Sequence, residues 1–322
     1  MTLTNTDSIV QEKAPELSEL EQARLQFRSD LLDAELLVDA GSPGLYGRSG
    51  TFEDILEAFD HAYTEALGSY GAKRFRFPPI YSRPDFESTD YIASFPNLTG
   101  AINTFAGNDR DHAALLKARA EGQPWDDWLS PTDSMLVSAV CHPLYGRLEG
   151  QRMAPGGSTF EVAGYCFRHE PSLDPMRLQA FRQHDFVYVG DEQGARDFRE
   201  QAFQKLLDLL KSLGLDAKGV AANDPFFGRA GRMLAHNQLS EELKLEIVVP
   251  IYPGLDDGTA IGSGNRHEDH FGSPFHIESA DGTVAHSACI GAGLERTTLA
   301  LLRTHGFELK DWPSDVRAKL AL

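Results

Sequence analysis

The sequence has few cysteines, no long apolar run and no secretory-type leader. Its 322 residues include only Cys141, Cys166 and Cys289, and an odd number in a chain of this length argues against a disulfide framework and for thiols kept reduced. No run of about 18 apolar residues occurs. Residues 1–13 are polar, without a basic segment leading into an apolar one. We therefore expect neither a membrane span nor a secretory signal, and we expect a cytoplasmic protein.

Positive charge is also scarce. The chain carries 30 Lys and Arg against 48 Asp and Glu, a formal net charge of −18, which repels a polyanion at long range unless a local basic face offsets it. Transfer RNA is therefore disfavoured as a partner. Hydrophobic residues make up 41% of the sequence, which is enough to bury the core of one large domain or of two modest ones.

Two apolar segments between residues 165 and 187 flank a short polar loop and predict a hairpin. Arg168, Arg177 and Phe181 are placed there to meet a polyphosphate and a flat ring. Two arginines can spread over phosphate oxygens in a bidentate manner, which lysine cannot do. A surface turn held by salt bridges would have the same composition, so the hairpin alone does not decide between the two.

A second segment, residues 287–302, reads as a Gly-rich strand end that leads into an apolar helix, with Arg296 in its first turn. Together, the Phe-Arg-x-Glu of the hairpin and this Gly-x-Gly-x-Glu-Arg resemble motifs 2 and 3 of class II aminoacyl-tRNA synthetases. The resemblance implies an α/β (α+β) fold, an antiparallel sheet flanked by helices. The helix expected at 51–68 and the proline-ended strand at 75–80 look like motif 1, the dimer-interface element, and imply a homodimer.

The pattern along the chain predicts two parts. Residues 1–50 form an N-terminal helical segment and linker, whose amphipathic stretch at 16–38 could dock on the core or on another chain. Residues 51–322 form the catalytic domain, with a helical insertion at about 196–244.

Cys141, Asp185 and Cys289 lie on three predicted strands that a class II fold would bring to one pocket. Two thiolates and a carboxylate with a fourth position open suit a zinc ion that binds a ligand. Isolated cysteines in apolar strands are, however, usually small core residues.

Three segments make the resemblance more specific: Cys141 to Tyr145, Phe167 to Glu170, and Ser287 to Cys289. Together they resemble the amino acid:[carrier protein] ligases, truncated relatives of the atypical, zinc-containing seryl-tRNA synthetases. The match covers about residues 50–310. In that family a Cys, a Glu and a Cys hold the zinc; the Glu position falls on Asp185 here, and the neighbouring His184 remains an alternative. The seryl-type enzymes carry a long N-terminal tRNA-binding region, and we expect the roughly 50 residues before the core here to be too few for one.

The resemblance implies ATP-dependent activation of a small amino acid, glycine or alanine, and its transfer to the phosphopantetheine thiol of a small acidic carrier protein. Arg168 and Glu170 would be catalytic, with Arg168 on the α-phosphate and the substrate carboxylate. Arg177 would hold the terminal phosphates. Phe181 and Arg296 would lie against the two faces of adenine.

The resemblance also implies which residues bind Mg²⁺ and the amino acid substrate. The Mg²⁺-bridging and ATP-binding carboxylate falls on Glu246 or Glu278, because the strand where such synthetases place a glutamate reads Thr259-Ala260-Ile261-Gly262-Ser263. The substrate positions fall on Ser263, Asn265 and Ala288.

Arg229 and Arg232 lie in a window of seven basic residues beside Phe226 and Phe227, and we expect this window to dock the carrier protein. A solvated helical face is an equally good reading. Two other functions compete with the ligase: charging of tRNA by a seryl-type synthetase, and a non-catalytic binding subunit derived from one.

Overall fold

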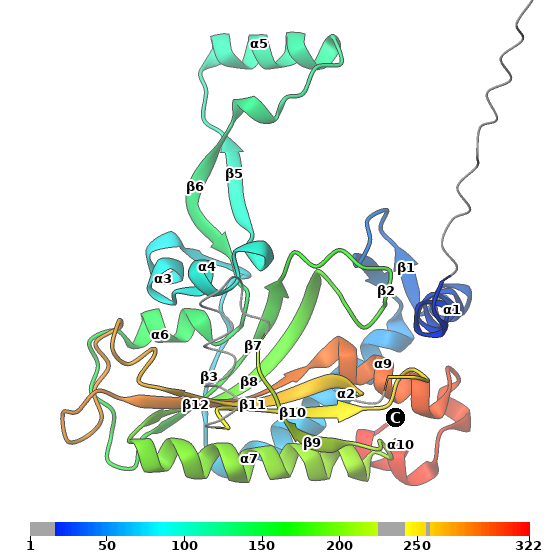
Figure 1. Cartoon of the computed structure of the whole chain (residues 1–322), viewed down its shortest axis with the longest axis vertical. Helices are drawn as coiled ribbons and strands as arrows, with labels where there is room; N and C mark the ends of the chain where they lie inside the picture. The colour runs from blue at the N-terminus through cyan, green and yellow to red at the C-terminus, as the bar shows by residue number, and fades with distance from the viewer. Residues whose placement is uncertain (1–16, 225–241, 256–257) are drawn as a thin grey trace, which may run out of the picture.

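The computed structural model describes residues 17–224, 242–255 and 258–322. Its centre is a seven-stranded sheet with the spatial order β3-β7-β8-β12-β11-β10-β9 (Figure 1). Neighbouring strands are antiparallel, except that β3 runs parallel to β7. The strands span Lys73–Phe75 (β3), Ser158–Phe167 (β7), Ala180–Gly190 (β8), Lys218–Ala221 (β9), Lys244–Val249 (β10), Thr259–Glu268 (β11) and His286–Gly293 (β12). The predicted antiparallel sheet flanked by helices is confirmed.

Three long helices, α2 (Gly50–Leu67), α7 (Glu192–Ser212) and α9 (Leu294–His305), cover one face of this sheet. The short helix α6 (His142–Leu148) packs on the other face. The remaining helices are α1 (Glu19–Asp33), α3 (Arg83–Ser88), α4 (Tyr91–Ser94), α5 (Asp109–Ala120) and α10 (Ser314–Leu320). Among the described helices, none combines the length and apolar character that crossing a bilayer requires.

The alternation of side chains along the strands divides the apolar interior into two cores. Phe186 and Tyr188 of β8 join the core under α2, α7 and α9. Val187 and Val189, one residue along, join the core of the opposite face. Adjacent residues on a strand therefore face different cores. Only predicted site residues that face the same core can meet.

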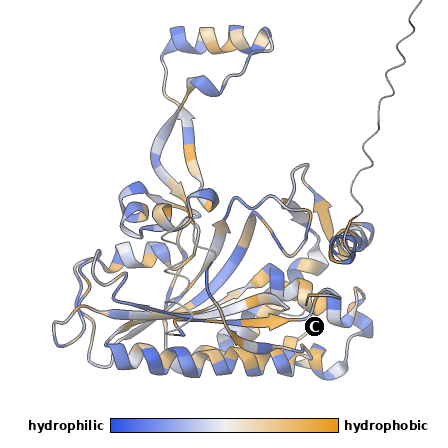
Figure 2. Cartoon of the chain, viewed as in Figure 1, coloured by the Kyte–Doolittle hydropathy of each residue, from blue (hydrophilic) through white to orange (hydrophobic). Residues whose placement is uncertain are grey.

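Helix α7 begins after Asp191, whose side chain accepts a hydrogen bond from the Gly194 amide. Its apolar stripe faces the sheet, and apolar and polar bands alternate along it in Figure 2. The predicted helical insertion at about 196–244 differs from the structure. Within the described part of this window, residues up to Ser212 are helical and residues 218–221 form β9, the edge strand paired with β10.

The N-terminal segment packs on the body of its own chain. Ser18 caps α1 through a capping box with Glu21, and Phe27 and Leu31 enter the main core with at most 1% of their surface exposed. A small hairpin, β1 (Leu37–Asp39) and β2 (Tyr46–Arg48), follows α1. Of the two predicted alternatives, this segment docks on the core.

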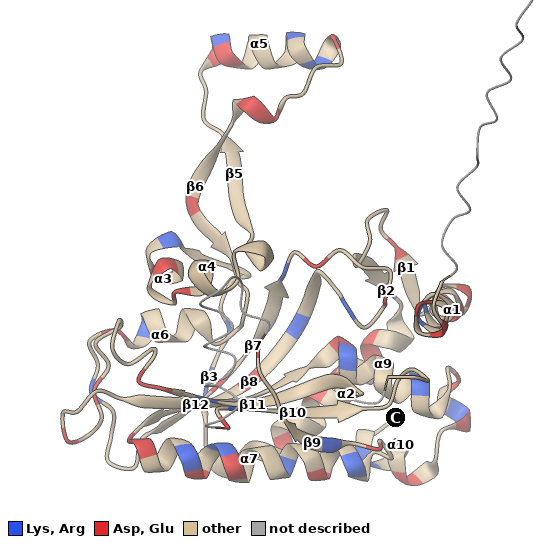
Figure 3. Ribbon diagram, viewed as in Figure 1, with Lys and Arg blue, Asp and Glu red and all other residues tan. Residues whose placement is uncertain are grey.

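A three-stranded sheet, β4-β6-β5, carries an arm that projects from the body with α5 at its tip (Figure 1). Its strands are β4 (Ile80–Ser82), β5 (Ala101–Phe105) and β6 (Leu129–Leu136). Figure 3 shows that helices such as α5 and α7 carry many of the charged residues and that the central strands carry few. The chemistry that depends on charge inside the body therefore rests on a small number of side chains.

One such group is a buried ion-pair network that joins α2, β8 and α9. Glu295 is fully buried and accepts hydrogen bonds from the backbone and the Nε of Arg182 at 2.6 and 2.9 Å. The other two nitrogens of Arg182 bind Glu53 of α2 at 2.6 and 2.8 Å. Arg48 of β2 adds a second cation 3.2 Å from Glu295. The network ties four elements that are distant in sequence.

We predict that Arg182→Ala lowers the free energy of unfolding by about 3 kcal/mol, because it leaves Glu53 and the buried Glu295 without their main partner. Lys117→Ala is the control, since Lys117 is 78% exposed and lies 3.9 Å from Glu121; it should cost less than about 1 kcal/mol. Urea unfolding of both variants measures the difference. Similar losses in the two variants would contradict the role of the network.

Candidate active site

The predicted hairpin is present as β7 and β8, which pair along their whole length with Cys166 opposite Phe181. Arg168 follows β7 directly. Its guanidinium lies 5.5 Å from the centre of the Phe181 ring, and its Nε donates to the carbonyl of Ser138 at 3.0 Å. The structure thus brings the predicted phosphate-binding and ring-stacking residues together.

Arg296 interacts electrostatically with both Arg168 and Arg177. Arg296, at the start of α9, donates from Nε to the carbonyl of Met176 at 2.7 Å. Burial lowers the pKa of Arg296, and the charges of Arg168 and Arg177 lower it further. Glu170 lies 3.6 Å from Arg177 and offsets part of this repulsion. A polyanion would relieve the mutual repulsion of these guanidinium groups, which is the chemistry expected of a phosphate-binding site.

The thiol and carboxylate candidates also meet, although one of them is not on a strand. Asp185 lies on β8 and Cys289 on β12, as predicted, but Cys141 is the N-cap residue of helix α6. The predicted strand at 136–143 is therefore wrong beyond Leu136, where β6 ends. Cys141 and Cys289 each expose 4% of their surface and Asp185 none.

The protonation states of the two thiols are linked. A hydrogen bond from Cys141 lowers the pKa of Cys289, and the nearby His267 lowers it further against the effect of burial. The same hydrogen bond, together with burial, raises the pKa of Cys141. Burial and the charge of Cys289 raise the pKa of Asp185. Both shifts favour thiolate character on Cys289 over Cys141.

Asp185 is held against a glycine of the neighbouring strand. Gly291 of β12 lies directly opposite it, and a Cβ at position 291 would be 2.4 Å from Oδ1 of Asp185. Neither carboxylate oxygen of Asp185 has a hydrogen-bond partner of good geometry. His184, the alternative, faces the other core and binds Asp60 at 2.6 Å, so it is not a ligand candidate.

These groups fit a zinc ion by their chemistry. Two sulfurs and a buried carboxylate with unpartnered oxygens are donors that zinc accepts. Within the described residues, no three His, Cys, Asp or Glu side chains are already arranged as a metal-binding cluster. Binding would therefore require the three side chains to adjust.

The predicted substrate residues divide between the two faces of the sheet. Asn265 of β11 donates to Ser263 Oγ at 3.3 Å and to Cys289 Sγ at 3.5 Å, so both polar residues belong to the site. Ala288 does not. It is fully buried in the core under α7, because it precedes Cys289 on the strand and faces the opposite way.

Among the described residues, neither carboxylate predicted to bridge Mg²⁺ belongs to a group of side chains that could hold a metal ion. Glu246 pairs with Ser263 across the strands, on the site face, but its carboxylate lies 2.9 Å from the ammonium of Lys244. Glu278 is bound to Arg152 instead, at 2.6 Å. A carboxylate already neutralised by a lysine is a poor ligand for Mg²⁺. The docking residues Arg229 and Arg232 lie outside the described residues.

Comparison with known proteins places the chain in a family. An amino acid–[acyl-carrier-protein] ligase 1 from Bradyrhizobium diazoefficiens is 37% identical over 294 residues, which cover 91% of this chain and 90% of that protein. Ligase 2 from the same organism is 38% identical over 294 residues, 91% of this chain and 87% of that protein. The chain belongs to the amino acid–[acyl-carrier-protein] ligase family. No family model matches the sequence.

Solved structures confirm that this ligase has the class II synthetase fold. The seryl-tRNA synthetase of M. kandleri, in complex with tRNASec of A. aeolicus, aligns with 97% of the chain at a TM-score of 0.78 and 18% identity. Seryl-tRNA synthetase from Pyrococcus horikoshii, complexed with ATP, covers 92% of the chain at a TM-score of 0.64 and 14% identity. The ligase spans 62% of each of those two chains.

One residue of the ligase site was missed in the sequence. His267 lies 3.5 Å from Cys289 through Nε2 and 3.0 Å from Ser287 Oγ through Nδ1. Tyr145 of α6 closes the group, with its hydroxyl 3.3 Å from Ser287 Oγ. The period of two along β11 would have indicated His267, because it follows Ser263 and Asn265 on the same face.

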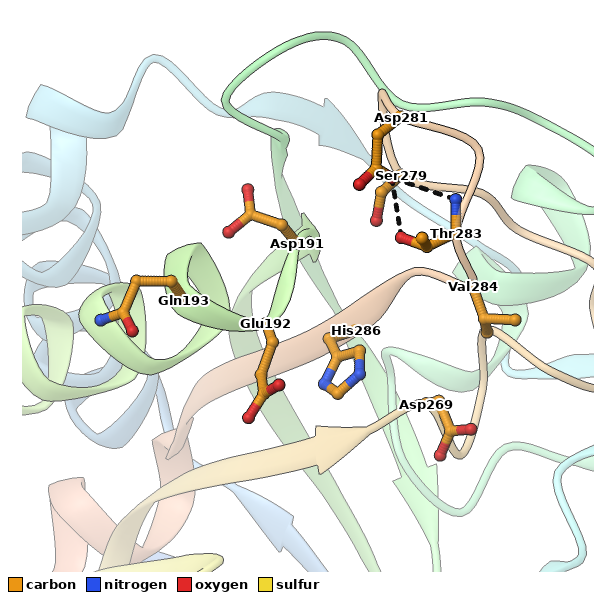
Figure 4. A pocket seen from close by; sticks show the side chains of 9 residues that line it. All are labelled: Asp191, Glu192, Gln193, Asp269, Ser279, Asp281, Thr283, Val284 and His286. Atoms are coloured by element: carbon orange, nitrogen blue, oxygen red, sulfur yellow. Dashed lines mark hydrogen bonds between the residues drawn. The ribbon is translucent and has the colours of Figure 1, made fainter.

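The ligase also has a hollow of about 580 Å³ away from the arginines, at the N-terminus of α7 (Figure 4). Four carboxylates and a histidine contribute to its lining: Asp191, Glu192, Asp269, Asp281 and His286. None of the predicted site residues lines this hollow. Its negative charge makes it unsuited to a nucleotide.

We predict that Gly291→Ala displaces the Asp185 carboxylate and lowers the free energy of unfolding by about 1–3 kcal/mol, because the added methyl group overpacks a buried site. Gly68→Ala is the matched control, because Gly68 has a φ of −58° and no heavy atom lies within 4 Å of the added Cβ. Denaturant unfolding compares the two. A Gly291→Ala protein as stable as the control would contradict the close approach.

Proposed function

We propose that this ligase activates a small amino acid, glycine or alanine, with ATP and transfers it to the phosphopantetheine thiol of a carrier protein. The observations that carry the proposal are the charge interactions among Arg168, Arg177 and Arg296 and the charge interaction of Arg168 with Asp185 of the buried thiol–carboxylate group. One part suits the phosphates of ATP and the other suits the amino end of the substrate. The names of the two Bradyrhizobium relatives support the carrier protein as acceptor.

In the first step the substrate carboxylate attacks the α-phosphorus of ATP, and pyrophosphate leaves. Arg168 holds the α-phosphate and the carboxylate, and Arg177 holds the terminal phosphates. Arg168 is well prepared for this role, because Phe181 and the Ser138 carbonyl hold its guanidinium in place. Positive charge aimed at the phosphates stabilises the transition state without reorganisation.

In the second step the carrier thiol attacks the carbonyl of the aminoacyl-adenylate, and AMP leaves while the thiol proton is lost. Glu170 accepts a hydrogen bond from the adenine amine or the substrate. Phe181 and Arg296 lie against the adenine ring, and each such contact is worth about 1 kcal/mol. Ser263 and Asn265 bind the amino acid beside Cys289.

Cys141, Asp185 and Cys289 would hold a zinc ion, which when bound supplies a Lewis acid for a neutral amino group. The burial of all three donors supports a small substrate. A homodimer is part of the same proposal. The α2 helix and β3, which lies at one edge of the sheet, would form its interface.

Replacement of either metal-binding cysteine should remove zinc. We predict about one zinc per chain in the purified protein, and its loss together with amino acid activation in Cys141→Ser and Cys289→Ser. Cys166→Ser is the matched control, because Cys166 is equally buried but binds Gln183 at 3.3 Å. Elemental analysis gives the metal content. Active enzyme without stoichiometric zinc would refute this assignment.

Loss of Arg168 should stop adenylate formation. Arg168→Ala is expected to reduce ATP–pyrophosphate exchange by about 10²–10³-fold, as for other lost transition-state contacts. Arg147→Ala, a change at an exposed arginine on α6, should leave exchange unchanged. Full exchange in a folded Arg168→Ala protein would remove the assignment of the hairpin.

The exchange assay is run with glycine, alanine, serine and cysteine, which identifies the preferred substrate. Exchange does not separate the proposed function from tRNA charging, because both reactions begin with an adenylate. Labelled amino acid recovered on a phosphopantetheinylated carrier protein, and not on tRNA, supports the proposal. Transfer to tRNA alone would overturn it.

A further inference from the structure

The loop between β7 and β8 contains a buried carboxylate that the proposed chemistry does not use. Asp174 exposes only 6% of its surface, although it lies in a loop. Its Oδ1 accepts hydrogen bonds from the Tyr252 hydroxyl at 2.5 Å and from the Met176 amide at 3.0 Å. Its Oδ2 lies 2.9 Å from Nε of Arg24 in helix α1, in an ion pair that is not aligned as a hydrogen bond.

The Arg24 side of this contact is built into the N-terminal helix. The Arg24 guanidinium lies 5.8 Å from the centre of the Tyr252 ring, and the same ring meets Phe27 edge-on at 6.2 Å. Burial and the charge of Asp174 raise the pKa of Tyr252, so its hydroxyl remains a donor. Helix α1 therefore presents a cation and an aromatic contact to one point of the loop.

Asp174 is linked in turn to the arginine cluster. Its carbonyl accepts a hydrogen bond from the Arg177 amide at 2.9 Å. The amide of Met176 donates to the Asp174 side chain, and the carbonyl of Met176 accepts a hydrogen bond from Nε of Arg296 at 2.7 Å. A displacement of Asp174 would thus move the backbone that positions both Arg177 and Arg296.

The small N-terminal hairpin supports the far end of the same loop. The Gln179 amide donates to the carbonyl of Gly44 at 2.9 Å, and its side chain donates to the carbonyl of Pro43 at 2.7 Å. Gly44 has a φ of +79°, and a Cβ there would be 3.1 Å from the Arg177 carbonyl. In Figure 1 the loop after β7 reaches toward β1 and β2.

We infer that the N-terminal segment, residues 19–48, acts as a brace for the ATP-binding loop, with Arg24 as a positioning residue that acts through Asp174 on Arg177 and Arg296. Arg24 does not touch the substrate. The inference rests on the proposed function only in assigning the terminal phosphates of ATP to this loop. The inference that Arg24 holds the loop in place does not depend on the proposed function.

The test compares Arg24→Ala with Arg28→Ala. Arg28 lies one turn along the same helix and is similarly exposed, 22% against 30% for Arg24, but it binds Asp39 and Tyr46 rather than the loop. Arg24→Ala should accelerate amide hydrogen exchange in peptides covering residues 172–178 and raise KM for ATP about tenfold, with KM for the amino acid close to the parent value. Arg28→Ala should change the loop exchange and the KM for ATP less than Arg24→Ala does, because Arg28 reaches the loop only through the hairpin.

Asp174→Ala and the double variant complete the cycle. The two single changes should not add, because each removes the same contact. Parent-like exchange in the loop of Arg24→Ala would overturn the brace, as would equal rises in both KM values. Faster loop exchange in a protein that never activates an amino acid would support the brace and refute the proposed function, so the two failures are distinguishable.

Discussion

The buried carboxylate of Glu295 is the constraint around which the site is assembled. An unpaired charge at that depth would be costly, so Arg182 and Arg48 must be brought to it from β8 and β2. Once Glu295 points toward these cations, the next residue of the helix, Arg296, turns by about 100° and faces the loop between β7 and β8. One ion-pair network thus sets the position of a nucleotide-binding residue that does not belong to it.

The sequence predicted the site correctly where a motif lies within one helix or strand, or within two that are adjacent in the chain. The hairpin, the Gly-rich strand leading into α9, and the three arginines could all be predicted, because each motif lies within one or two adjacent elements. Cys141 was assigned to the correct site but to the wrong element. The apolar residues 137–140 look like the end of a strand, yet they form a turn that leads into a helix.

The errors have a common physical origin in strand geometry and distance. Ala288 adjoins a site residue in sequence, but neighbouring strand residues face opposite sides, so it enters the core instead. His267 keeps the period of two along β11 despite the register shift between Arg266 and Glu268, so strand geometry carried a signal for it that the family motifs did not include. The contact between Arg24 and Asp174 joins segments far apart in the chain, so no local sequence pattern predicts it.

The burial of Phe27 and Leu31 has a practical consequence for anyone preparing a shortened protein. A fragment cut at residue 51, where the linker was expected to end, would expose the apolar core residues that pack against these side chains and would leave Asp174 without its cation. Such a fragment would be prone to aggregation, since exposed apolar patches of this kind favour self-association. The smallest useful fragment therefore begins ahead of α1, at or before its capping residue Ser18.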